Sequence, residues 1–231
     1  MLVVSLLGIG GMIYLKQAGD HENARRTAAA LAEAQQRAAS DAALQQSLLE
    51  EYGGESHDAH QQALVAKVMR AITTRSDAKT HQPPLKAHLL AEPNRINLFA
   101  LPTGDIYLTT ALLNRMQTEG QLAAALAHGA AHVLSGERLA AVMVGSAGQT
   151  ELAYDTAIEP KADIATLALM AQAGYHPNAY ISMFTVLLAA YQTHAEVAFF
   201  ITHPNAADRL QQIYQAIQAQ FPQGIPKELS Q

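Results

Sequence analysis

The chain has 231 residues, which is enough for one domain with extensions or for two small domains. It contains no cysteine, which excludes disulfides, thiol catalysis, Cys-ligated zinc and a lipid-modified N-terminal cysteine. The net charge of -5 and the scattered basic residues argue against a nucleic-acid partner, and a hydrophobic fraction of 49% can fill a core.

The N-terminal segment is almost wholly apolar from Met1 to Leu15, and Lys16 follows it. This run is short for a membrane span, which takes about 20 residues. It fits a signal-peptide core or a short anchor, with a buried core helix as the alternative. We therefore expect residues 1–19 to be a secretion signal or membrane anchor. This predicts contact with a membrane and a periplasmic or membrane-anchored protein of the cell envelope.

The next segment, residues 20–50, is rich in Ala, Gln, Arg and Glu and is predicted to be a helical spacer. The glycines of "YGGES" at 52–56 interrupt it. A second helix is expected at about 57–75, because apolar residues recur there at helical spacing. We expect the folded domain to cover residues 51–220, and residues 221–231 to form a loose tail.

Three short extended runs follow, at 86–91, 96–101 and 105–110, and "PTGD" at 102–105 is a turn between the last two. Thr118 with Gln121 forms a capping box that opens a helix reaching about Leu134. Further helices are expected near Gly136, at 158–173 before a C-cap at Gly174, from "HPNAY" at 176–180, and at 206–220 after Asn205. The fold class is therefore α+β and mostly helical, with a small sheet between helices.

Two histidines carry the first sign of chemistry. His128 and His132 are four residues apart, so both imidazoles leave the same face of the predicted helix. Two neutral imidazoles on one rigid face suit Zn²⁺. Without further ligands, such a pair is more often structural.

Two carboxylates extend this pattern. "AIEPKAD" supplies Glu159 and Asp163, four residues apart on a predicted helix. A catalytic zinc needs a third protein ligand, which Glu159 can supply. Asp163 can accept the second N–H of a ligating histidine and fix its tautomer. The alternative is an ordinary solvated acidic face, which Lys161 between them would suit.

The order of these motifs resembles a known family. The stretch "NRINLFALPTGDIYLTTALLNRMQTEGQLAAALAHGAAHV" is similar to the core of metallopeptidase family 48. This gluzincin group includes HtpX heat-shock, CAAX prenyl endopeptidase and periplasmic quality-control proteases. The family then has an acidic motif, as at 159–163, followed by "AGYHP" at 173–177, "THP" at 202–204 and Arg209. The resemblance covers residues 49–215.

The resemblance implies a zincin-like metallopeptidase domain whose small sheet packs against the active-site helix. It implies one Zn²⁺ ion held by His128, His132 and Glu159, with Asp163 orienting a histidine. His203 caps the metal or binds an oxyanion, or is a surface histidine, and Arg209 fixes its loop or is an ordinary surface residue. An edge strand beside the zinc helix would pair with unfolded or extended polypeptide. Its residues are Asp105, Ile106, Tyr107, Leu108 and Thr109.

One departure from the family affects the chemistry. The family's glutamate after the first histidine, which acts as general base, is replaced by Gly129. Glu119 and Glu137 are each nine residues from His128 and point to the opposite side of a helix. We therefore expect a zinc-binding metalloendopeptidase homologue with peptide-bond hydrolysis lost or weakened. The alternatives are a chaperone-like peptide-binding module of envelope quality control, and an active protease with an unrecognised base.

Overall fold

A computed structural model of the chain describes residues 26, 29–33, 35–36, 39–81, 84–136, 140–144, 149–153, 157–193, 203 and 206–229. The chain divides into two compact units, residues 1–47 and 48–231. Every described residue of the first unit is helical, in agreement with the helix predicted over 20–50. The apolar run at residues 1–15 lies outside the described residues. None of the described helices is long and apolar enough to cross a membrane.

Helix α2, Ala59–Arg75, confirms the prediction for residues 57–75. Asp58 caps it by accepting hydrogen bonds from the backbone N–H groups of His60 and Gln61, each at 3.0 Å. The apolar stripe of α2 faces the core and consists of Val65, Val68, Met69 and Ile72.

The small sheet has three strands: β1 (Lys86–Leu90), β2 (Leu98–Ala100) and β3 (Asp105–Thr109). Their order is β1-β3-β2, with β1 parallel and β2 antiparallel to β3. The prediction that 105–109 is an edge strand is therefore wrong, because β3 is the central strand. β2 and β3 form a hairpin, so β2 pairs with one side of β3. β1, which precedes both in the chain, pairs in parallel with the other side.

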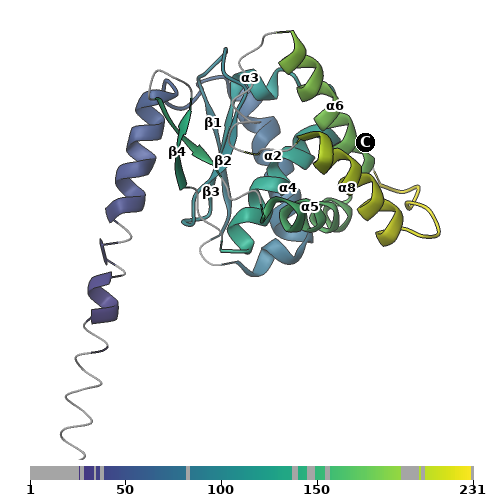
Figure 1. The fold of residues 1–231 in the computed structure, drawn as a ribbon, viewed down its shortest axis with the longest axis horizontal. Coiled ribbons are helices and arrows are strands. Elements are labelled where there is room, and N and C mark those ends of the chain that lie inside the picture. The colour runs from purple at the N-terminus through teal and green to yellow at the C-terminus, as the bar shows by residue number, and fades with distance from the viewer. Residues whose placement is uncertain are drawn as a thin grey trace, which may run out of the picture. The chain divides into compact units, whose positions relative to one another are not determined.

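The central helix of the domain is α4, Glu119–Leu134, which follows the short α3, Thr110–Leu113. Thr118 accepts a hydrogen bond from Gln121 N–H at 3.2 Å, and the Gln121 side chain accepts one from Gln117 N–H. Every residue of α4 from Gly120 to Val133 is buried, because α4 packs against α2, α5, α6 and the sheet (Figure 1). Its alanine-rich sequence permits this close approach on several sides.

The next residues described after Gly136 form strands rather than the predicted helix. Gly136 adopts a positive φ of 72°, which ends α4 in the manner of a C-terminal glycine. The following residues form an antiparallel hairpin of β4 (Ala140–Val144) and β5 (Gln149–Ala153). Val142 and Val144 are β-branched and favour a strand over a helix.

Three helices complete the domain: α5 (Glu159–Ala173), α6 (Asn178–Gln192) and α8 (Ala206–Gln220). α5 ends at Gly174, whose φ of 93° confirms the predicted C-cap. α5 contacts α4, α2 and α8, and α6 contacts α4 and α8 (Figure 1). Asn205, the expected cap of α8, lies outside the described residues. Phe221 and Ile225 are partly buried against the core, so the segment expected to be a loose tail packs in part.

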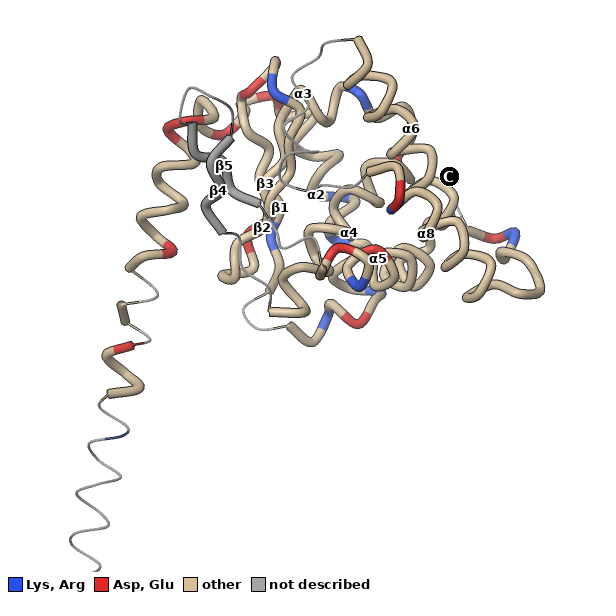
Figure 2. The backbone as a smooth tube through the Cα atoms, in the orientation of Figure 1, with Lys and Arg blue, Asp and Glu red and all other residues tan. Residues whose placement is uncertain are grey.

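Charged residues of both signs are interspersed along the described elements (Figure 2). Three charged side chains are nevertheless almost completely buried: Glu159, Asp163 and Arg209. Buried charges are rare unless they are paired or bind a metal. These three residues therefore point to the place where the domain concentrates its chemistry.

Candidate metal centre

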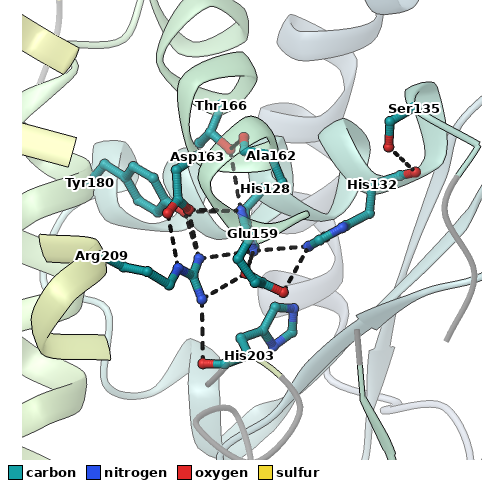
Figure 3. Close-up of polar contacts among 10 residues, drawn as sticks. All are labelled: His128, His132, Ser135, Glu159, Ala162, Asp163, Thr166, Tyr180, His203 and Arg209. Carbon is teal, nitrogen blue, oxygen red and sulfur yellow. Dashed lines mark hydrogen bonds and ion pairs between the residues drawn. The ribbon is translucent and has the colours of Figure 1, made fainter. Parts of the chain in front are cut away.

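Four potential metal ligands meet beneath α4. His128 and His132 come from α4, Glu159 is the first residue of α5, and His203 precedes α8 (Figure 3). One ligand atom from each lies within 4.8 Å of all the others. Each of the four residues is at most 1% exposed. The helical spacing predicted from the sequence therefore places both histidines on one face, and the fold adds a carboxylate and a third imidazole.

The ligand atoms are closely spaced. Nε2 of His128 lies 3.1 Å from Nε2 of His132 and 3.4 Å from Oε2 of Glu159. Nε2 of His132 lies 3.6 Å from Oε1 of Glu159. Both carboxylate oxygens of Glu159 are buried and accept no hydrogen bond from the described residues, although Oε2 forms an ion pair with Arg209. Such an arrangement of donor atoms around a common point suits a metal ion.

The hydrogen bonds around His128 fix its tautomer. The Tyr180 hydroxyl on α6 donates to Oδ1 of Asp163 at 2.6 Å, since a carboxylate can only accept. The Thr166 hydroxyl donates to the carbonyl of Ala162 at 2.7 Å. Both oxygens can then accept the Nδ1–H of His128, from which they lie 2.9 and 3.3 Å. The lone pair of His128 Nε2 is therefore left facing the other ligand atoms, as a metal ligand requires.

Asp163 is close to His128 but is not hydrogen-bonded to it. Its Oδ1 lies 3.6 Å from Nδ1 of His128, which is too long for a hydrogen bond, and Tyr180 bridges the two groups. Sequence reasoning missed Tyr180 and Thr166. Thr166 lies three residues after Asp163 on α5, so helical spacing from the acidic motif could have identified it. No comparable local signal marks Tyr180, because it comes from a different helix.

Arg209 is buried rather than on the surface. Its guanidinium contacts both oxygens of Asp163, at 2.9 Å from Nε and 2.6 Å from Nη2. Its Nη1 lies 2.7 Å from Oε2 of Glu159 and donates to the carbonyl of His203 at 3.3 Å. Burial alone would lower the pKa of Arg209, but its hydrogen bonds and charge interactions with Asp163 raise it. The guanidinium therefore stays charged and joins α8, α5 and the His203 segment.

The buried site shifts the pKa values of its ligands. Burial raises the pKa of Glu159 to about 7, against the opposing effect of Arg209. Burial, together with the charge of Arg209, lowers the pKa of His128 to about 3. The pKa of His132 is lowered by burial, by His128 and by Arg209. Both histidines are therefore neutral near pH 7 and ready to bind a metal.

Metal affinity should consequently depend on pH below about pH 7. Of the ligands His128, His132 and Glu159, only Glu159 must lose a proton on metal binding between about pH 5.5 and 7, because His128 and His132 are already neutral. The apparent affinity for Zn²⁺ should rise about tenfold per pH unit in this range and level off above it. Competition with a chromophoric chelator across this range measures the slope. A steeper slope would mean that the histidines also release protons.

Neither Gly129 nor the predicted peptide-binding strand is part of the metal-ligand cluster. Gly129 lies on the buried middle of α4, one residue after His128. Within β3, the backbone of Asp105–Thr109 pairs with β1 along its length and with β2 through Ile106, Tyr107 and Leu108. The Tyr107 ring stacks between His88 and Phe99, with centroids 4.7 and 5.3 Å away. The strand therefore serves the core of the sheet rather than its edge.

The fold and site together are those of a mostly helical α+β domain with a buried His/His/Glu/His cluster at one end of its central helix. The family model of peptidase family M48 matches residues 58–154 and 138–217. The chain belongs to this family, which confirms the resemblance seen in the sequence.

Two curated relatives are similar to part of this chain. One is the mitochondrial metalloendopeptidase OMA1 of Schizosaccharomyces pombe, 30% identical over 174 residues, which cover 64% of this chain and 50% of the relative. The other is a putative beta-barrel assembly-enhancing protease of Vibrio cholerae, 27% identical over 176 residues, which cover 61% of this chain and 36% of the relative. The match thus spans half or less of each relative.

Proposed function

We propose that this chain binds one Zn²⁺ ion through His128, His132 and Glu159, with His203 as a fourth protein ligand. The observation that carries the proposal is the spacing of the ligand atoms of His128, His132 and Glu159, 3.1 to 3.6 Å, with a ligand atom of His203 within 4.8 Å of them. A tetrahedral zinc with bonds of about 2.0–2.2 Å has ligand atoms about 3.3–3.6 Å apart. Three imidazoles and a carboxylate are also ligand types that zinc accepts.

Bound zinc in a peptidase polarises a carbonyl and lowers the pKa of its water. Of the other groups that such a reaction needs, this chain supplies those that orient the ligands but not the general base. Asp163 and Tyr180 orient His128, and Arg209 balances the charge of the two carboxylates. Gly129 stands where the family has a glutamate base, and it has no group that accepts a proton. We therefore propose that peptide-bond hydrolysis is lost or severely weakened.

Glu119, Glu159 and Asp163 do not offer a replacement. Glu119 is bonded to Lys67 and Tyr175 at the far end of α4. Glu159 and Asp163 are engaged with Arg209. Glu137, the remaining candidate from the sequence, lies outside the described residues. His203 adds a second obstacle, since a fourth protein ligand competes with water for the remaining position on the metal.

The ligand class follows from the family. Peptidases act on polypeptides, so we propose an extended or unfolded polypeptide as the binding partner. The name of the Vibrio cholerae relative refers to beta-barrel assembly, and that of the yeast relative to mitochondria. We propose a location in the cell envelope, with residues 1–19 as the secretion signal or membrane attachment.

The metal content of the purified 231-residue chain tests this function directly. Mass spectrometry of the metals should find about one zinc per chain. His128→Ala should lose this zinc, whereas His60→Ala, which changes an exposed histidine of α2, should retain it. Absence of zinc from the natural chain after loading and desalting would refute the proposed site. Equal zinc in His128→Ala would show that the metal binds elsewhere.

A further inference from the structure

The space beside Gly129 is already filled. An ideal Cβ on Gly129 would lie 2.7 Å from Cγ2 of Ile106, 3.6 Å from its Cγ1 and 3.4 Å from Cδ2 of Leu98. Carbon atoms in favourable contact are about 3.5–4.0 Å apart. Even a methyl group at position 129 would therefore overlap Ile106 in the present packing, and a glutamate side chain needs considerably more room.

A small movement of Ile106 or of α4 cannot easily remove this overlap. Ile106 lies on the central strand β3, where it faces Ala87 of β1 and Ala100 of β2 in the ladder. Its backbone is thus held from both sides, and it is completely buried. As a β-branched residue it has few alternative χ1 rotamers. α4 cannot easily retreat either, because α2, α5 and α6 pack against it.

We propose that the close packing of Ile106 against α4 makes glycine at position 129 a packing requirement of this chain. Apart from proline, glycine is the least favourable residue within a helix, so its presence at mid-helix calls for a compensating gain. Close packing of α4 on β2 and β3 supplies that gain. The statement that position 129 is the place of the missing general base rests on the proposed function, whereas the packing requirement does not.

A double-mutant cycle on thermal stability tests the proposal. Gly129→Ala alone should lower the Tm, although alanine is the better helix former. In the Ile106→Ala background, where both Cγ atoms are gone, the same Gly129→Ala change should raise the Tm. As a matched control for helix propensity, Ala66→Gly on the exposed face of α2 should lower the Tm. The sign of the Gly129→Ala effect, reversed by Ile106→Ala, is the expected result.

A higher Tm for Gly129→Ala in the natural background would overturn the proposal. If Gly129→Ala does not fold, recovery of folded protein on adding Ile106→Ala supports it, and failure to recover overturns it. Zinc content measured on the same samples separates the two proposals. Sign reversal without zinc leaves the packing proposal standing and the metal site refuted. Zinc without sign reversal supports the metal site and overturns the packing proposal.

Discussion

Replacing Asp163 by asparagine should lower the free energy of unfolding by about 3 kcal/mol, because it leaves the buried guanidinium of Arg209 with one carboxylate fewer. Asp163 and Arg209 are each about 2% exposed and share two hydrogen bonds, so water cannot replace the lost charge. The cost stays near the lower end of the usual range of about 3–5 kcal/mol, since Glu159 still pairs with Arg209. Urea unfolding of metal-free protein measures this change.

The same substitution should also weaken zinc binding, by about 10- to 100-fold. An amide at position 163 can donate to the Tyr180 hydroxyl, and the hydroxyl can then direct its own proton toward Nδ1 of His128. The tautomer of His128 that presents its Nε2 lone pair to the metal is then no longer fixed. Lys67→Ala is the matched control, because it removes the ion pair of Lys67 with Glu119, and the Lys67 side chain is 66% exposed. It should change stability by less than about 1 kcal/mol and leave zinc affinity unchanged. Equal effects of the two substitutions would show that the buried network contributes little.

The sequence allows the helical part of the site to be predicted because its signals are local. The capping box at Thr118 sets the start of α4, and the four-residue spacing of His128 and His132 sets their common face. The same spacing places Glu159 and Asp163 one turn apart on α5. Family resemblance supplied His203, which no spacing relation connects to the other ligands.

The parts that could not be predicted depend on long-range packing. Whether residues 105–109 form a central or an edge strand depends on which strand β1 pairs with. The alternation of side chains along the strand does not encode this pairing. Tyr180 reaches His128 from a helix 52 residues away along the chain. The close contact between Gly129 and Ile106 likewise joins α4 to β3. A glycine in a sequence does not reveal which neighbour requires it.

Gly129→Glu alone should remain without measurable peptide hydrolysis, whereas Gly129→Glu combined with Ile106→Ala should gain it. The single variant has a carboxylate but no room to place it, because Ile106 Cγ2 already lies 2.7 Å from the position of Cβ. Removing both Cγ atoms of Ile106 opens that space. A positioned general base contributes about 10²–10⁴-fold in rate, so zinc-loaded double variant should cleave unfolded casein at least about 100-fold faster than the natural chain.

Two further variants decide how this result is read. Adding His128→Ala to the double variant should abolish the gained cleavage, since the activity requires the metal ligand. Adding His203→Ala should increase the cleavage, because a protein side chain no longer competes with water for the fourth position. If Gly129→Glu alone cleaves as fast as the double variant, Ile106 is no barrier. If the folded, zinc-loaded chain carrying all three changes, Gly129→Glu, Ile106→Ala and His203→Ala, remains inactive, the site lacks more than its base and an open position, and its surviving function is to bind rather than to cut.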